Sequence, residues 1–202
     1  MLSPFEAKRL LSVVEGDCLA ALYRVALTLG MRQAEILGLR WQDVDIDERR
    51  LRVQQTLQRI GKEIVIKEPK TERSRRTLAL TPSLVSALVA HKDRQEFERK
   101  SAGKDWQESG LVFASTIGTP LDARNLTREF KRHLLAAAPP SELRFYDMRH
   151  AAASLLIADG LPVTAVSAML GHALTSTTLN VYAHVLPGAD RLTAEAMERL
   201  LG

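Results

Sequence analysis

Cysteine, aromatic side chains and long apolar runs are scarce in this chain of 202 residues. Cys18 is the single cysteine, which excludes a disulfide within the chain and fits a cytosolic compartment. No uninterrupted apolar run is long enough to cross a bilayer, and residues 1–4 lack the charged and then apolar pattern of a signal peptide. These absences predict a cytoplasmic protein that does not span a membrane.

Clusters of metal ligands and internal repeats are also missing from the sequence. The histidines, the cysteine and the acidic residues form no tight group with ligand spacing, so we expect no metal. Lys and Arg together number 28 against 24 Asp and Glu, a net charge of +4. This mild basic excess is compatible with a nucleic-acid partner but is weak support on its own.

Helix signals flank a central region that has the alternation of strands. Ser3, Pro4 and Glu6 predict a capping box that starts a helix running to about Val14. Further helices are predicted over residues 17–29 (ended by Gly30), 32–38, a long segment from Thr81, 122–137, 146–159, 162–170, a segment around Tyr182, and 189–200. Residues 51–57, 63–67 and 76–80 alternate as strands. We therefore predict an α+β fold, mainly helical, with a small three-stranded antiparallel sheet.

Five polar side chains in separate predicted elements form a candidate site for a phosphate. They are Arg32, Lys70, Arg149, His172 and Tyr182. A guanidinium binds two phosphate oxygens through its planar fork. Arg32 starts its own helix, and Arg149 shares a helix face with Tyr146, three residues earlier. Lys70 lies in the turn between the second and third strands, and His172 follows Gly171, where its ring can donate a hydrogen bond.

Tyr182 is the candidate nucleophile. A free phenol has a pKa of roughly 10, so at neutral pH it needs cationic neighbours or a base in order to react. Preorganised cations also stabilise the charge that develops on a phosphorane-like transition state. Taken alone, each residue has an ordinary explanation as a solvated surface charge, a helix-end partner or a half-buried tyrosine. It is their combination that favours chemistry.

Five short motifs in a fixed order carry a resemblance to a known family. They are Gly30-Met31-Arg32-Gln33-Ala34-Glu35, Pro69-Lys70-Thr71, Tyr146-Asp147-Met148-Arg149-His150, Leu170-Gly171-His172 and Tyr182-Ala183-His184. In these motifs, and over essentially all of residues 1–202, the chain resembles the catalytic domain of tyrosine recombinases, the phage-integrase family. The resemblance implies the DNA breaking-rejoining fold of that family and a role in DNA recombination and integration for a phage or another mobile element.

The resemblance also implies a mechanism. Tyr182 would attack the scissile phosphodiester, forming a 3′-phosphotyrosyl bond and freeing a 5′-hydroxyl. Arg32 and Arg149 would clamp the non-bridging oxygens, Lys70 would protonate the leaving 5′-oxygen, and His172 would hydrogen-bond the phosphate or assist proton transfer. The covalent link stores the bond energy, so neither ATP nor a metal is needed, and no cofactor is expected.

One residue departs from the family pattern, because Tyr146 stands where most members carry histidine. A phenol can donate a hydrogen bond to phosphate but is a poor proton shuttle near pH 7. The change therefore either lowers the rate or alters little if Lys70 supplies the acid. A second interpretation, in which Tyr146 is the nucleophile, is disfavoured because Tyr182 occupies the matching motif.

Partners and domain organisation follow from the same resemblance. It implies double-stranded DNA as the partner and a homotetramer on DNA for the full-length protein, with the isolated domain as a monomer. Because Met1 already begins the catalytic domain, we expect the family's N-terminal core-binding domain to be absent, and DNA affinity to be low and strongly salt-dependent. Residues 189–202 form a C-terminal segment that docks on a neighbouring subunit or packs on its own domain. Two alternatives stay open: an inactive integrase remnant that only binds DNA, and a type IB topoisomerase.

Overall fold

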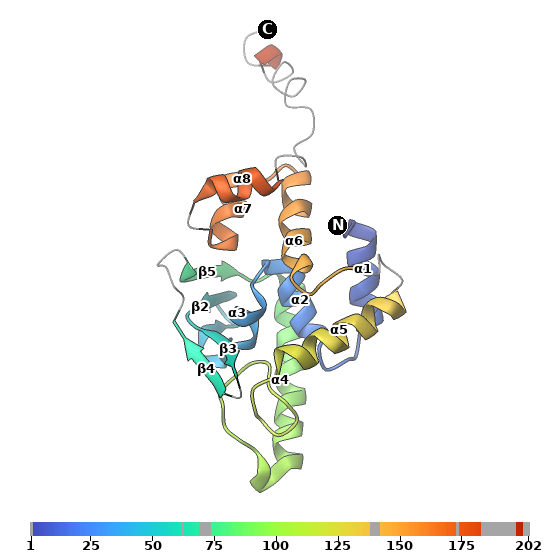
Figure 1. The fold of residues 1–202 in the computed structure, drawn as a ribbon, viewed down its shortest axis with the longest axis vertical. Coiled ribbons are helices and arrows are strands. Elements are labelled where there is room, and N and C mark those ends of the chain that lie inside the picture. Colours follow the sequence, from blue (N-terminus) through green and yellow to red (C-terminus); the bar gives the residue numbers. More distant parts are fainter. Residues whose placement is uncertain are drawn as a thin grey trace.

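The computed structural model describes residues 2–61, 63–68, 74–137, 142–172, 174–182 and 197–199. Within these ranges the predicted α+β architecture, mainly helical, is confirmed (Figure 1). The α-helices are α1 (Pro4–Val13), α2 (Ala20–Leu29), α3 (Gln33–Leu37), α4 (Pro82–Ala102), α5 (Ala123–Ala137), α6 (Asp147–Ala158), α7 (Val163–Leu170) and α8 (Thr175–Tyr182). Short 3₁₀ turns span Trp41–Asp43 and Gly103–Asp105. The strands are β1 (Val44–Asp45), β2 (Arg50–Val53), β3 (Thr56–Ile60), β4 (Glu63–Lys67) and β5 (Arg76–Ala79).

Local sequence signals set the helix ends. The Ser3 side chain accepts a hydrogen bond from the Glu6 backbone N–H at 3.2 Å, and the Glu6 carboxylate accepts one from the Ser3 N–H at 2.7 Å, which confirms the predicted capping box. Gly30 and Gly171 end α2 and α7 in the left-handed conformation, with φ of 57° and 68°. The chain changes direction at both glycines, so each of the two motifs that begin there starts at a corner.

The strands depart from the predicted single sheet of three strands. The expected first strand over residues 51–57 is divided into β2 and β3, and two sheets result, with orders β1-β2-β5 and β3-β4. The cause is a close approach of α3 to β3: a Cβ on Gly38 would lie 2.9 Å from the Leu57 backbone nitrogen. The Gln55 amide also donates to the Gly38 carbonyl at 2.8 Å. This contact bends the chain between residues 53 and 56, so β3 leaves the first sheet.

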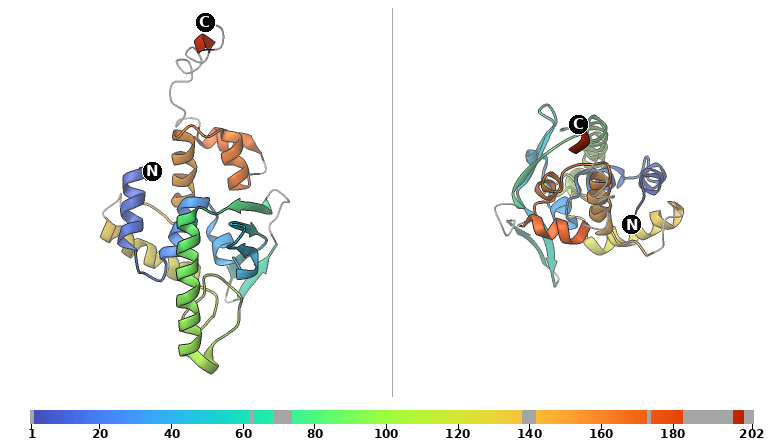
Figure 2. Two further views of the ribbon diagram at one scale, coloured as in Figure 1. Left: turned by 180° about the vertical axis from the view of Figure 1, so that it is seen from behind. Right: turned by 90° about the horizontal axis from the view of Figure 1, so that it is seen from above.

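The helices form the body on which the site is built. Helix α2 packs against both α4 and α6, and α1 packs on α5, while the sheets lie on the opposite side of α2 and α6 from α1 and α5 (Figures 1 and 2). Helices α7 and α8 pack on each other and on α6. Their contact forms a small apolar cluster of its own, made by Ala153, Ile157, Val166, Leu170 and Tyr182. Over the described part of the chain, no helix is long and apolar enough to cross a membrane.

Candidate active site

Arg149 joins three segments that are far apart in the sequence. Its side chain projects from α6, and the residue is 2% exposed. One terminal nitrogen donates to the Gly30 carbonyl at 2.6 Å, and the other donates to the Leu170 carbonyl at 2.7 Å. Arg149 therefore fixes the α2–α3 corner, which leads into Arg32, against the end of α7, which leads into His172.

A buried carboxylate that was not predicted as a site residue holds Arg32. Arg32 is the N-cap residue of α3, and its side chain donates to Glu35 at 2.9 Å while its backbone N–H donates to the same carboxylate at 2.8 Å. Glu35 is 2% exposed, whereas the Arg32 side chain is 37% exposed. The guanidinium is thus held at its inner edge and remains open to a ligand outside.

A third arginine, Arg76 on β5, completes this cluster. Its two terminal nitrogens donate to both Glu35 oxygens, at 3.1 and 2.9 Å, and its Nε donates to the Met169 carbonyl at 2.6 Å. Burial raises the pKa of the Glu35 carboxyl, but the hydrogen bond and charge of Arg76, together with Arg32, lower it more, so the net pKa lies below its ordinary value. Glu35 is therefore ionised at neutral pH.

The three arginines leave the cluster with a positive excess. Arg32, Arg76 and Arg149 carry three positive charges against the single negative charge of Glu35. Burial, and then the charges of Arg32 and Arg76, lower the pKa of Arg149 to about 10, which still leaves it charged at neutral pH. Two of these arginines also bind consecutive carbonyls at the C-terminal end of α7, where the helix dipole favours cations. An anion placed between them would relieve their mutual repulsion.

His172 lies directly after this end of α7 and is neutral. Burial, followed by the charges of Arg149, Arg32 and Arg76, lowers its pKa to about 4. Its Nδ1 is 2.7 Å from the Thr178 hydroxyl on α8. If Thr178 donates this hydrogen bond, the ring proton lies on Nε2, which is then a donor for an oxygen of a ligand.

Tyr182, at the end of α8, is paired with a histidine that was not predicted as a site residue. The Tyr182 hydroxyl forms a hydrogen bond with Nδ1 of His150 at 2.8 Å, and the hydroxyl is the donor when the neutral ring carries its proton on Nε2. Burial raises the pKa of the phenol to about 12, although the nearby Arg149 charge acts in the opposite direction. The residue is 2% exposed, so neighbouring side chains must move before a DNA phosphate reaches Oη.

Tyr146 lies at the start of the same helix as Arg149 but is more exposed to solvent. It is the N-cap residue of α6 and is 46% exposed. Its ring packs edge-on against His150, with the ring centroids 4.9 Å apart. Lys70 lies outside the described residues, as does most of the predicted C-terminal segment 189–200.

Glu35, His150 and Arg76 were not predicted as site residues, and the sequence around them differs in how clearly it pointed to them. Glu35 and His150 stand inside the quoted motifs, three residues after Arg32 and one after Arg149, and this proximity was the available signal. Arg76 stands in a strand among other arginines, and nothing in its local sequence distinguishes it.

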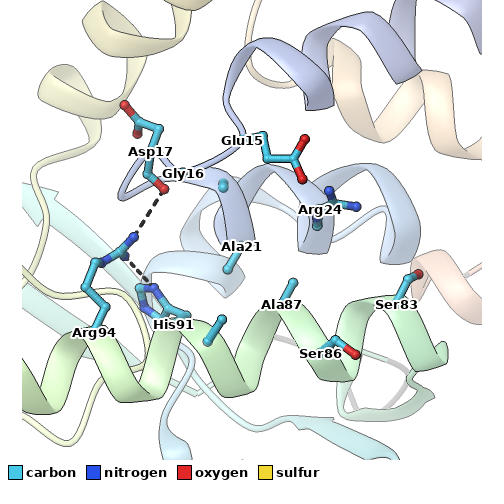
Figure 3. Close-up of a pocket in the computed structure, with 12 residues that line it drawn as sticks. Glu15, Gly16, Asp17, Ala21, Arg24, Ser83, Ser86, Ala87, His91 and Arg94 are labelled. Atoms are coloured by element: carbon cyan, nitrogen blue, oxygen red, sulfur yellow. Dashed lines mark hydrogen bonds between the residues drawn. The ribbon is translucent and has the colours of Figure 1, made fainter.

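A pocket of about 660 Å³ lies elsewhere, between the α1–α2 connection, α2 and α4 (Figure 3). At its edge Arg94 donates to the Asp17 carbonyl at 3.1 Å and to His91 Nδ1 at 2.6 Å. Burial lowers the pKa of His91 to about 4, so the ring is neutral and can accept. The lining contains none of the predicted site residues, and the pocket is separate from the arginine cluster.

The family model described as "Phage integrase family" matches residues 1–188, and the chain therefore belongs to the phage integrase family. Its curated relatives include a tyrosine recombinase XerC-like protein of Caldanaerobacter subterraneus subsp. tengcongensis, 35% identical over 96% of this chain and 53% of the relative. An integrase of Streptomyces ambofaciens is 36% identical over 88% of this chain and 47% of the relative. The chain thus spans about half the length of these relatives.

Solved structures show the same fold. The Tn1549 transposon integrase in complex with transposon right end DNA superposes with a TM-score of 0.81 at 27% identity, over 100% of this chain and 66% of that one. The catalytic domain of bacteriophage HP1 integrase has a TM-score of 0.62 at 19% identity, over 100% of this chain and 94% of that domain. The predicted integrase-type catalytic fold is confirmed.

Proposed function

We propose that this chain is the catalytic part of a site-specific DNA recombinase or integrase, which breaks and rejoins DNA strands through a covalent 3′-phosphotyrosyl intermediate. The observation that carries the proposal is the cluster of three arginines around one buried carboxylate, located beside a tyrosine whose hydroxyl is already hydrogen-bonded to a histidine. Its positive excess fits a phosphodiester, and the phenol supplies a nucleophile without a further reagent.

Each residue has a part in the proposed reaction. Arg32 and Arg149 bind the non-bridging oxygens, and their charge stabilises the pentavalent transition state. His172 donates a hydrogen bond to the phosphate from Nε2, with Thr178 fixing the tautomer. Lys70 protonates the leaving 5′-oxygen, and the exposed Tyr146 hydroxyl contacts the DNA backbone. Two observations support this assignment. The His172 imidazole is neutral, and the Arg32 side chain is partly exposed to solvent.

The substrate and the assembly are proposed from the relatives. The Tn1549 integrase was solved in complex with DNA, which supports double-stranded DNA as the partner of this chain. We propose action in the cytoplasm as a homotetramer on DNA, with residues 1–202 as the catalytic domain and residues 189–202 docking on a neighbouring subunit. The chain spans about half of its curated relatives, so these statements concern the whole recombinase.

Covalent trapping tests the proposed function. Supercoiled plasmid is incubated at low salt with the wild type or with Tyr182→Phe, and the reaction is quenched with detergent. We expect protein–DNA adduct and relaxed plasmid from the wild type and neither from the variant, with DNA binding retained in a gel-shift assay. Adduct formation that persists in Tyr182→Phe but is lost in Tyr146→Phe would instead make Tyr146 the nucleophile.

A DNA-binding remnant without activity is the second candidate. It is favoured by the burial of Tyr182 and by Tyr146 in the position where the family usually carries histidine. This candidate predicts that the wild type shifts DNA on a gel while giving neither adduct nor relaxation, on supercoiled and on nicked plasmid alike.

A further inference from the structure

The hydroxyl of Tyr182 forms a defined hydrogen bond with His150. His150 Nδ1 is 2.8 Å from Oη, and the two ring centroids are 5.8 Å apart. The pair crosses from α8 to α6, so the contact is tertiary and does not arise from helical spacing. When the neutral imidazole carries its proton on Nε2, the proton which Tyr182 must lose is directed at the Nδ1 lone pair.

His150 has the protonation state that a base requires. Burial lowers its pKa from the ordinary value, Arg149 and Arg144 lower it further, and Asp147 raises it. His172, beyond the end of α7, also lies within electrostatic range of His150, and the rings of Tyr146 and Tyr182 pack against it. The net effect is a lowered pKa, which favours the neutral imidazole at pH 7, and the Nε2–H tautomer of that neutral ring leaves Nδ1 as an acceptor.

The position of His150 relative to Tyr146 explains how the departure from the family pattern can be tolerated. A tyrosine in place of histidine cannot accept a proton near neutral pH, because a phenol has a pKa of roughly 10. His150 lies four residues further on, which is about one helical turn, and on the same face. The Tyr146 ring packs on its edge and limits how the imidazole can turn.

Resting on the proposed function, we infer that His150 is the general base of this site and takes the proton of Tyr182 during strand cleavage. As the Tyr182 Oη–phosphorus bond forms, the phenol proton moves to His150 Nδ1 and the phosphorus–O5′ bond breaks. The 5′-oxygen takes a proton from Lys70, the acid of the proposed mechanism. In rejoining, the 5′-hydroxyl attacks the phosphotyrosine and gives its proton back to the neutral Lys70 amine. The phosphorus–Tyr182 oxygen bond breaks, and the His150 imidazolium returns its proton to the departing Tyr182 oxygen. His150 is thus a catalytic residue that contacts a reacting atom.

The substitution His150→Asn separates proton transfer from hydrogen bonding, because the amide oxygen of asparagine accepts a hydrogen bond but does not take up a proton near neutral pH. Positioned general bases contribute roughly 10²–10⁴-fold in rate, so adduct formation on supercoiled plasmid at pH 7.5 should fall about 100-fold or more. Between pH 5 and 9, the wild-type rate should rise through the pKa of His150 and then level off. The variant should lack this inflection while still shifting plasmid DNA on a gel.

His133→Asn is the matched control. His133 Nδ1 is 3.1 Å from the Tyr23 hydroxyl in a buried pair between α5 and α2, away from the arginine cluster. This variant should keep both the rate and the inflection of the wild type. Thermal melts of the two variants separate a folding defect from a catalytic one.

A titration of wild-type protein keeps the inference testable even if His150→Asn does not fold. The ring nitrogens of His150 are followed by NMR as a function of pH in the wild type and in Tyr182→Phe. Loss of the phenol donor, which stabilises the neutral ring, should raise the pKa of His150, and an unchanged titration would contradict the Tyr182–His150 hydrogen bond.

The outcomes for the inference and for the proposed function can be told apart. If the wild type forms adducts that are lost in Tyr182→Phe, but His150→Asn keeps the rate and the inflection, the inference is overturned and the proposed function stands. Absence of wild-type adducts would overturn both.

Discussion

Arg149 has a structural part, which its hydrogen bonds show, and a proposed part in binding phosphate. A guanidinium carries five N–H donors, and two of those of Arg149 bind the Gly30 and Leu170 carbonyls. Three further N–H groups are not used by these two carbonyls, and the two carbonyl contacts fix the plane of the fork. Arg32 shows the same division, because Glu35 holds one side of it and the other side is open. In both cases the contacts that position the cation also reduce the entropy lost on binding a phosphate.

Loss of the Glu35 charge should destabilise the folded protein, because Glu35 is the buried carboxylate that pairs with Arg32 and Arg76. Replacing one partner of a buried ion pair leaves an uncompensated charge, so Glu35→Gln should lower the free energy of unfolding by about 3–5 kcal/mol at pH 7. Urea denaturation measures this change. Glu96→Gln is the control, since Glu96 pairs with Arg99 on the solvent-exposed part of α4, and such pairs contribute less than about 1 kcal/mol. Equal effects of the two substitutions would contradict the prediction.

The same substitution should also change how the free energy of unfolding depends on pH. Because the pKa of Glu35 in the folded protein lies below its ordinary value of 4.5, its ionised form contributes stability above pH 4.5. This contribution is lost as the pH falls through the lower folded-state pKa. Glu35→Gln should therefore flatten the acid limb of the stability curve, and its difference from the wild type should shrink below pH 4.5.

At the scale of elements, the α2–α3 corner depends on the absence of a side chain at Gly30. Its φ is 57°, and an added Cβ would lie 2.8 Å from Leu170 Cδ2 on α7. Leu170 is fully buried, so its side chain has little room to turn. A displaced corner would also move the carbonyl that accepts from Arg149. This single position thus couples the end of α2, the end of α7 and the arginine cluster.

Gly30→Ala measures that coupling. Left-handed backbone costs an alanine about 1–2 kcal/mol, and overpacking adds about 1–3 kcal/mol, so we expect a total loss of about 2–5 kcal/mol. Gly160→Ala is the matched control, because Gly160 also has a positive φ, 92°, but nothing lies within 4 Å of its added Cβ. The difference between the two variants in chemical denaturation reports the packing against α7. A difference near zero would show that Leu170 moves aside freely.

The elements differ in how far their sequence determined them. Helix ends were predictable because capping is local: Ser3 with Glu6, Thr81 before α4, and the glycines that end α2 and α7 act within a few residues. The strand break was not predicted, because Leu51, Val53 and Leu57 keep the two-residue period of a strand and only Gln55 departs from it. What divides them is the approach of Gly38 from α3 to the backbone of Leu57, a tertiary contact that no local pattern records.

Across the whole molecule, the candidate site shows the same contrast. The ordered motifs indicated Arg32, Arg149, His172 and Tyr182, and the family they implied is confirmed. The partners of these residues were not predicted, since the bonds are long-range: Arg76 to Glu35 spans 41 residues, Tyr182 to His150 spans 32, and Arg76 to Met169 spans 93. The family was thus readable from the motifs, whereas the hydrogen-bond network around the candidate residues required the fold.

The whole-molecule charge gives a last prediction, on DNA binding. The net charge is only +4, so affinity should depend on a few phosphate contacts and should fall with salt at a slope set by their number. Fluorescence anisotropy of a labelled duplex gives the slope of log K against log salt. Arg32→Gln removes one proposed contact and should reduce the magnitude of that slope by about 1. Arg9→Gln removes the same charge from an exposed position on α1, a helix that carries none of the proposed site residues, and should leave the slope nearly unchanged. If both variants lower the slope equally, general attraction rather than the arginine cluster governs binding.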